Sequence, residues 1–155
     1  MARKDSAGVF APPPVIYGAG LLLGFILHAL YPVRFLPEGP ARVAAGVSLI
    51  APGVFLGLWA AALMVRAGTT VEPHGTTTRI IATGPFAFSR NPIYIGLSLG
   101  YVGVAVAFNA LWPLLLLPAV WLVMVKGVIE REEAYLERKF GEVYVDYKRN
   151  VRRWL

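Results

Sequence analysis

The sequence contains no cysteine, only two histidines and few charges, which amount to 15% of its 155 residues. Without cysteine the chain has no disulfide bond, thiolate metal site or cysteine nucleophile. Two histidines are also too few for a metal site. No Gly-x-Gly-x-x-Gly run follows a strand-like segment, so the dinucleotide-binding turn of soluble α/β enzymes is missing as well. These absences exclude several common kinds of soluble active site.

Long apolar runs take up most of the chain instead. Hydrophobic residues make up 57% of it, and its mean hydropathy is +0.60, far more apolar than a soluble domain. A transmembrane helix needs roughly 20 apolar residues, and the sequence offers four such segments, near 15–33, 43–65, 92–108 and 111–129. The length leaves no room for a second domain. We therefore predict one all-α membrane domain over residues 1–155 with about four transmembrane helices.

Two of these segments have unusual features. The first follows Arg3 and Lys4 as a signal peptide would, but no small-x-small cleavage site follows it and three more apolar segments do, which favours a retained helix. The second carries Pro52 and Gly53 at its middle. Membrane helices tolerate this pair when neighbouring helices satisfy the freed backbone groups, so we expect a kink there.

The basic residues predict the orientation of the helices. If the N-terminus, the loop 66–91 and the tail with Lys126 share one side, that side holds all of the 15 lysines and arginines except Arg34 and Arg42. The positive-inside rule then places both termini in the cytoplasm, and we expect a prokaryotic inner membrane. Because the basic residues flank apolar runs and form no separate arm, anionic membrane lipids are favoured over nucleic acid as their partners.

The tail predicts an amphipathic helix that bends near Gly141. Apolar and aromatic residues recur in it at intervals of three or four: Leu136, Phe140, Tyr144, Tyr147 and Val151. Such a helix lies against the membrane or against the spans. Six basic residues of the tail are expected to touch lipid phosphates: Arg138, Lys139, Lys148, Arg149, Arg152 and Arg153.

Polar residues gather at two places that the topology brings together. Only two residues separate the third and fourth segments, so these form a tight antiparallel hairpin. The start of the third and the exit of the fourth then lie at the same level, with Arg90, Asn91, Pro92 and Tyr94 beside Glu130, Glu132 and Glu133. Charges near the bilayer are costly unless they are paired or bind a ligand. Either a salt bridge that fixes the hairpin or a pocket for a charged ligand explains the arrangement.

These elements resemble the signature of a known enzyme superfamily. The run GPFAFSRNPIYIG at 84–96, followed by Glu-Glu-x-x-Leu-x-x-x-Phe-Gly-x-x-Tyr-x-x-Tyr at 132–147, is similar to that of the isoprenylcysteine carboxyl methyltransferase and phospholipid methyltransferase superfamily. The resemblance covers roughly residues 66–151. It departs from the pattern at Asn91, where the family usually has histidine, and an asparagine cannot act as a base.

The resemblance implies that the half of the chain over 66–151 binds S-adenosylmethionine. It implies catalytic roles for Arg90, Asn91 and Glu133. Carboxylates and aromatic faces suit the sulfonium cation of this cofactor, and Arg90 suits its carboxylate. The expected cofactor-binding residues are Gly84, Pro85, Arg90, Asn91, Pro92, Tyr94, Gly96, Glu132, Glu133, Tyr144 and Tyr147.

The predicted function is thus methyl transfer to a lipidic or amphipathic small acceptor at the membrane–cytoplasm interface. One alternative is an NADPH-dependent membrane reductase of the sterol-reductase type, but the extra phosphate would call for more clustered basic residues than the acidic pair allows. A second alternative is a non-catalytic helical scaffold, which the glycines of the third segment favour because they let helices approach closely.

The remaining titratable residues have structural interpretations. His28 is expected to form a hydrogen bond within the bundle. His74 and its neighbour Glu72 are expected in a solvated loop. Lys126 and Glu130 are four residues apart and should pair along one helix face.

Overall fold

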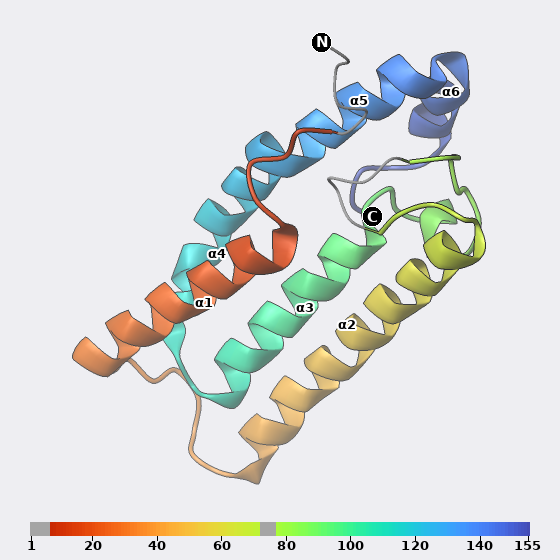
Figure 1. Cartoon of the computed structure of the whole chain (residues 1–155). Coiled ribbons are helices and arrows are strands. Elements are labelled where there is room, and N and C mark those ends of the chain that lie inside the picture. Colours follow the sequence, from red (N-terminus) through yellow and green to blue (C-terminus); the bar gives the residue numbers. More distant parts are fainter. Residues whose placement is uncertain (1–6, 72–76) are drawn as a thin grey trace.

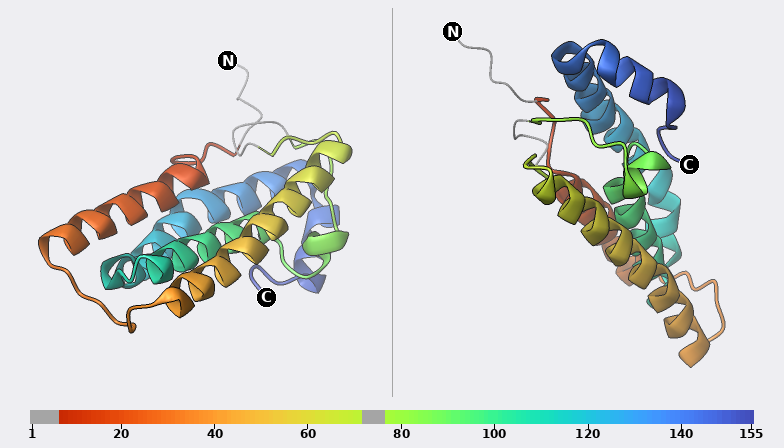
Figure 2. Two further views of the ribbon diagram at one scale, coloured as in Figure 1. Left: turned by 90° about the horizontal axis from the view of Figure 1, so that it is seen from below. Right: turned by 90° about the vertical axis from the view of Figure 1, so that its right-hand side faces the viewer.

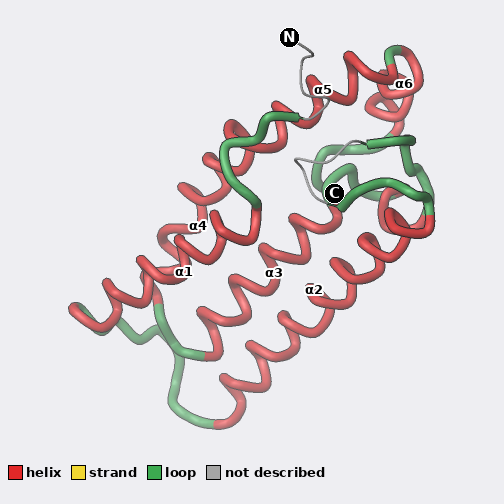
Figure 3. Tube along the Cα trace, in the orientation of Figure 1, coloured by secondary structure: helices red, strands yellow, loops and turns green. Residues whose placement is uncertain are grey.

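A computed structural model of the chain describes residues 7–71 and 77–155, and these contain helices but no strand (Figures 1 and 3). His74 and Glu72 lie outside the described residues. The all-α prediction is therefore confirmed. The helices in chain order are α1 (Pro13–Leu30), α2 (Pro40–Arg66), the 3-10 turn η1 (Gly84–Ala87), α3 (Pro92–Ala107), α4 (Leu111–Met124), the π-helical turn η2 (Val125–Ile129), α5 (Glu130–Phe140) and α6 (Glu142–Asn150).

Three helices in the described part of the chain are long and apolar enough to cross a membrane. They are α1, α2 and one 30-residue helix, Leu111–Phe140, formed by α4, η2 and α5. The third predicted span, α3, is apolar but has only 16 residues. Helices occupy all four predicted segments, but the last helix does not end near 129, because it continues into the charged tail.

The helices pack in two pairs, with α2 along α3 and α1 along α4 (Figure 2). The first pair is held close by glycines. A Cβ atom on Gly96 would lie 2.5 Å from the carbonyl oxygen of Gly53, and one on Gly103 would lie 2.6 Å from that of Gly46. Backbones can approach this closely only where side chains are missing. The predicted role of glycine in the third segment is thus confirmed, and α2 stays helical through Pro52.

The π-helical turn η2 joins the N-terminal segment to the long helix. A π turn interrupts the regular backbone bonding of an α-helix. In η2 the carbonyl of Gly127 accepts a hydrogen bond from the backbone N–H of Phe10 at 3.0 Å. Arg131, one turn further, donates from Nη1 to the carbonyl of Gly8 at 2.9 Å. The N-terminal segment is therefore fastened along the helix that carries the acidic residues.

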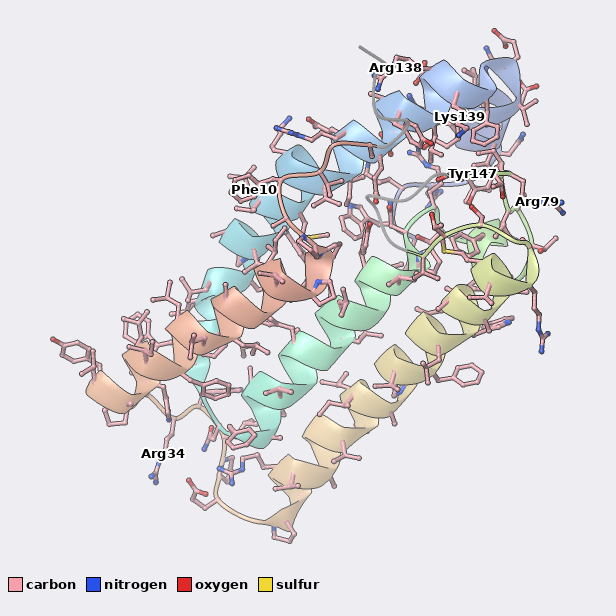
Figure 4. The ribbon with its side chains drawn as sticks, in the orientation of Figure 1. Phe10, Arg34, Arg79, Arg138, Lys139 and Tyr147 are labelled. Atoms are coloured by element: carbon pink, nitrogen blue, oxygen red, sulfur yellow. The ribbon has the colours of Figure 1, made fainter. Side chains whose placement is uncertain are left out.

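The two ends of the bundle differ in their charge. Figure 4 shows Arg34 at one end, and Arg79 and Arg138 at the other, beside α5 and the loop before α3. This is the distribution on which the predicted orientation rests.

At the Arg34 end, the buried side chain of Asn109 binds the connection between α1 and α2: its Oδ1 accepts from the N–H groups of Phe35 and Leu36, at 3.0 and 2.9 Å. His28 Nδ1 is buried without a hydrogen-bond partner among the described residues, contrary to expectation.

Candidate active site

A cavity of about 390 Å³ opens at the end of the bundle where α5 begins. Its walls come from the N-terminal segment, the end of α2, the loop before α3, the start of α3, and α5 and α6. The surface that lines the cavity is mostly apolar. Eight of the predicted site residues line it: Arg90, Asn91, Pro92, Tyr94, Glu132, Glu133, Tyr144 and Tyr147.

Glu133 is the centre of an ion-pair cluster at the floor of this cavity. The residue as a whole is 8% exposed. Arg90 Nη1 lies 2.9 Å from its Oε1, while Arg153 donates from Nε to Oε1 at 3.0 Å and from Nη2 to Oε2 at 2.7 Å. Such a buried charge is tolerated only when it is fully paired. The start of α3 and the exit of the fourth span do converge, as the hairpin predicted.

Arg153 was expected to touch lipid phosphates, and the structure corrects this. Its planar guanidinium group donates one hydrogen bond to each carboxylate oxygen of Glu133. Among side chains, only arginine offers this bidentate geometry. The hydrogen bonds to Glu133 raise the pKa of Arg153 above its ordinary value. Sequence reasoning missed it because the contact depends on how the tail folds back after Gly141.

Two hydrogen-bond donors of Arg90 have no partner among the described residues. Its side chain is 10% exposed, and Nε and Nη1 are buried without a hydrogen-bond partner in the described part of the chain. Nη1 is at ion-pair distance from Glu133, but its N–H groups are not aligned with the carboxylate oxygen. Buried donors without partners are rare and costly. Because Arg90 also lines the cavity, its guanidinium group is placed to meet an anionic group of a ligand there.

Glu132 lines the same cavity, but a tyrosine hydroxyl bonds it where arginines bond Glu133. Its two oxygens accept from the hydroxyl of Tyr94, at 2.8 and 2.9 Å. No cation pairs with this carboxylate among the residues that the structure describes. Because α3 supplies Tyr94 and α5 supplies Glu132, the contact also joins these helices. The arrangement leaves a largely buried carboxyl group available to a cationic ligand.

Two tyrosines of α6 form the aromatic wall. Tyr144 is buried, and the Tyr147 hydroxyl donates to the carbonyl of Phe86 at 2.8 Å. Burial raises the pKa of Tyr144 to about 12 and also raises the pKa of Tyr147. Both phenols are therefore neutral at physiological pH. Their ring centroids lie 6.2 Å apart, and such rings offer π faces to a cation or to a planar base.

Asn91 lines the cavity but is also occupied by a structural contact. Its Nδ2 donates to the carbonyl of Arg153 at 2.9 Å, and its backbone N–H donates to Ser89 Oγ at 3.1 Å. Ser89 Oγ in turn donates to the same Arg153 carbonyl at 3.2 Å. The side chain that replaces the family histidine thus holds the C-terminal residues in place.

Three predicted cofactor-binding residues do not line the cavity: Gly84, Pro85 and Gly96. Gly96 packs against α2, and Gly84 has a positive φ of 59° and lies against Leu63 and Trp59 of that helix. Pro85 is buried in η1. All three support the backbone that carries Arg90 and Asn91.

The cavity also has lining residues that the sequence did not single out. The connection between α2 and η1 contributes Thr69, Thr70, Val71, Thr77, Arg79, Ile80 and Ile81. These residues have no motif and no periodicity, so no signal could have found them. Glu130 points elsewhere and pairs with Lys126 at 2.7 Å, as predicted.

Comparisons with known proteins identify the family of the chain. The family model for phospholipid methyltransferase matches residues 41–143, well over half of the chain. An uncharacterized protein of Haemophilus influenzae is 40% identical over 63 residues, which cover 41% of this chain and 79% of that protein. No solved structure matches the chain. The chain belongs to the phospholipid methyltransferase family of integral membrane methyltransferases.

Proposed function

We propose that the chain transfers a methyl group from S-adenosylmethionine to a lipidic or amphipathic small acceptor. The observation that carries this proposal is that an acidic and a basic side chain with unused binding capacity line one cavity. Among the described residues, Glu132 has no cationic partner, and Arg90, although paired with Glu133, has two donors without a hydrogen bond. S-Adenosylmethionine carries the complementary groups, a sulfonium cation and a carboxylate.

Within this proposal the residues have separate tasks. Glu132, held by Tyr94, attracts the sulfonium, and Arg90 binds the carboxylate of the methionine part. Tyr144 and Tyr147 provide aromatic faces for the cation or the adenine. Glu133 orients Arg90 and makes no ligand contact of its own, because both of its oxygens are already bound by arginine.

The chemistry requires position more than a strong base. The cosubstrate supplies an electrophilic methyl group: the acceptor lone pair forms the new bond to carbon while the carbon–sulfur bond breaks, and its electrons stay on sulfur. An in-line displacement of this kind is accelerated by holding donor and acceptor at near-attack distance. A carboxylate or thiolate acceptor fits this scheme directly, whereas an amine or thiol must also release its proton to water. The mostly apolar walls suit an oily acceptor.

A nicotinamide cofactor fits the cavity less well. NADPH carries a 2′-phosphate and a diphosphate, which need clustered arginines and lysines. Among the described residues, the lining contains only Arg79 and Arg90 as basic side chains, which is too few for both phosphate groups. The acidic residues of the same lining oppose a highly anionic ligand. The cavity therefore favours the methyl donor.

Thermal unfolding of the purified protein in detergent tests the proposal. S-Adenosylhomocysteine at 100 times its dissociation constant should stabilise the folded state by about 2.7 kcal/mol, whereas NADPH should not. Arg90→Gln should abolish this stabilisation. Arg42→Gln is the matched control, since Arg42 also pairs with a glutamate but at the opposite end of the bundle.

The alternatives predict different results. Stabilisation by NADPH alone would indicate a reductase, and stabilisation by neither ligand a scaffold. Methyl transfer from radiolabelled S-adenosylmethionine into a total lipid extract then identifies the class of acceptor.

A further inference from the structure

We propose that residues 151–155 form a C-terminal strap that holds Arg90 and Glu133 in their ligand-binding arrangement, with Arg153 as the positioning residue. The strap lies beyond the part of the chain that the family model matches, which ends at 143. Figure 1 places the C-terminus beside the start of α3. The nature of the ligand rests on the proposed function, whereas the strap contacts do not.

The strap first contacts the backbone that leads into α3. The N–H of Arg90 donates to the carbonyl of Arg152 at 2.9 Å. The next carbonyl, that of Arg153, accepts from Asn91 Nδ2 at 2.9 Å and from Ser89 Oγ at 3.2 Å. Each of the three residues 89–91 therefore donates one hydrogen bond to a strap carbonyl. This fixes the loop from which the Arg90 side chain extends.

The side chains of the strap reach two other helices. Arg153 binds both oxygens of Glu133 on α5. Trp154 lies against Trp121 of α4, with ring centroids 6.2 Å apart, and packs on the hydrophobic core. The strap is thus tied to α3, α4 and α5 within a few residues, so it locks the helices that carry the site to one another.

Arg153 also determines how Glu133 meets Arg90. Its two hydrogen bonds fix the plane of the carboxylate, and Arg90 Nη1 then contacts a single oxygen without an aligned hydrogen bond. Without Arg153, Glu133 is free to turn and form the bidentate pair with Arg90 that arginine and carboxylate prefer. The donors of Arg90 would then be occupied. Arg153 thereby keeps the guanidinium group of Arg90, which lines the cavity, out of a bidentate pair with Glu133, although Arg153 itself does not line the cavity.

Substitution of Arg153 tests this role in the full-length protein. With Arg153→Gln, we expect the dissociation constant of S-adenosylhomocysteine, measured by calorimetry, to rise at least tenfold. The KM for the methyl donor should rise to a similar degree while kcat changes less than threefold. Arg153→Lys keeps the charge but not the bidentate hydrogen bonding of the guanidinium group. Its affinity should lie between those of the native protein and Arg153→Gln. Arg152→Gln is the control, because the Arg152 side chain is exposed and only its carbonyl is used.

A second measurement follows the strap without any ligand. The chain has no cysteine, so Leu155→Cys gives a single thiol for a spin label, at an exposed position. The label should be restrained in the otherwise native protein and with Arg152→Gln. It should become mobile with Arg153→Gln.

The two measurements separate the possible failures. If the native protein does not bind S-adenosylhomocysteine but Arg153→Gln still frees the label, the strap stands and the proposed function fails. If Arg153→Gln frees the label without weakening ligand binding, the positioning role is wrong. If it weakens binding while the label stays restrained, Arg153 acts without the strap, and the proposal is overturned. Unchanged binding and an unchanged label also overturn it.

Discussion

Two arginine–glutamate–arginine clusters occupy opposite ends of the bundle. In the outer cluster, Glu38 pairs with Arg34 at 3.3 Å and with Arg42 at 3.1 Å, and the glutamate side chain is 57% exposed. In the inner cluster, Glu133 pairs with Arg90 and Arg153, and its side chain is 11% exposed. The residue types and distances are alike. The difference lies in burial and in how far apart in sequence the partners are.

That difference decides what each cluster contributes. Exposed ion pairs are worth about 0 to 1 kcal/mol, because water and salt screen them. A buried pair adds little net stability, but removal of one partner leaves an unpaired charge and costs about 3–5 kcal/mol. The outer cluster is therefore dispensable. The inner one fixes a single arrangement of three segments around a cavity.

Glu133→Gln should have the largest effect. The substitution leaves the largely buried Arg90 and the partly exposed Arg153 without their counter-charge, so we expect the free energy of unfolding to fall by about 3 kcal/mol and the affinity for S-adenosylhomocysteine to fall at least tenfold. Chemical denaturation in detergent and calorimetry measure the two quantities. Unchanged affinity in a folded variant would remove Glu133 from the site.

Tyr94→Phe should have an intermediate effect. It leaves the Glu132 carboxyl group without its hydrogen-bond donor, and a buried polar group that loses its partner costs about 1–3 kcal/mol. We expect a drop of about 2 kcal/mol in unfolding free energy together with weaker binding of S-adenosylmethionine, whose sulfonium Glu132 is proposed to attract. Tyr31→Phe, at an exposed tyrosine of the opposite end, should change neither. Native binding by Tyr94→Phe would show that the Tyr94–Glu132 contact is structural only.

Asn91→His should have a small effect on activity. A histidine N–H can donate to the Arg153 carbonyl in place of Nδ2, so methyl transfer should stay within threefold of the native rate. Asn91→Asp has nearly the same shape but no donor when ionised, and it should lower activity clearly. Complete loss with histidine would show that the chain uses its asparagine for a task that imidazole cannot perform.

Glu38→Gln should have the smallest effect, at most about 0.5 kcal/mol in unfolding free energy. Ligand binding should be unchanged, because the outer cluster lies far from the cavity lining. A loss as large as that of Glu133→Gln would contradict the contrast between the two clusters.

The sequence predicted those features that depend on local pattern or on simple topology. Apolar runs gave the spans, and the short connection at Asn109 predicted that Tyr94 and Glu132 meet. The pairing of Lys126 with Glu130 follows from helical spacing. By contrast, the contact of Arg153 with Glu133 requires the tail to reverse at Gly141 and return to α3. The spacing of residues in the sequence does not predict this course of the chain. The irregular connection that supplies Thr69 and Arg79 to the cavity likewise shows no sequence pattern.

The π-helical turn Val125–Ile129 has a consequence for the acidic pair beyond its bond to Phe10. Such a turn holds one more residue than an α-helical turn, and each residue rotates a helix by about 100°. The extra residue therefore rotates the following residues of the helix about the helix axis. This rotation helps bring the side chains of Glu132 and Glu133 to the side that faces α3. Removing one residue from this turn would send both carboxylates toward another face, although the composition of the helix would hardly change.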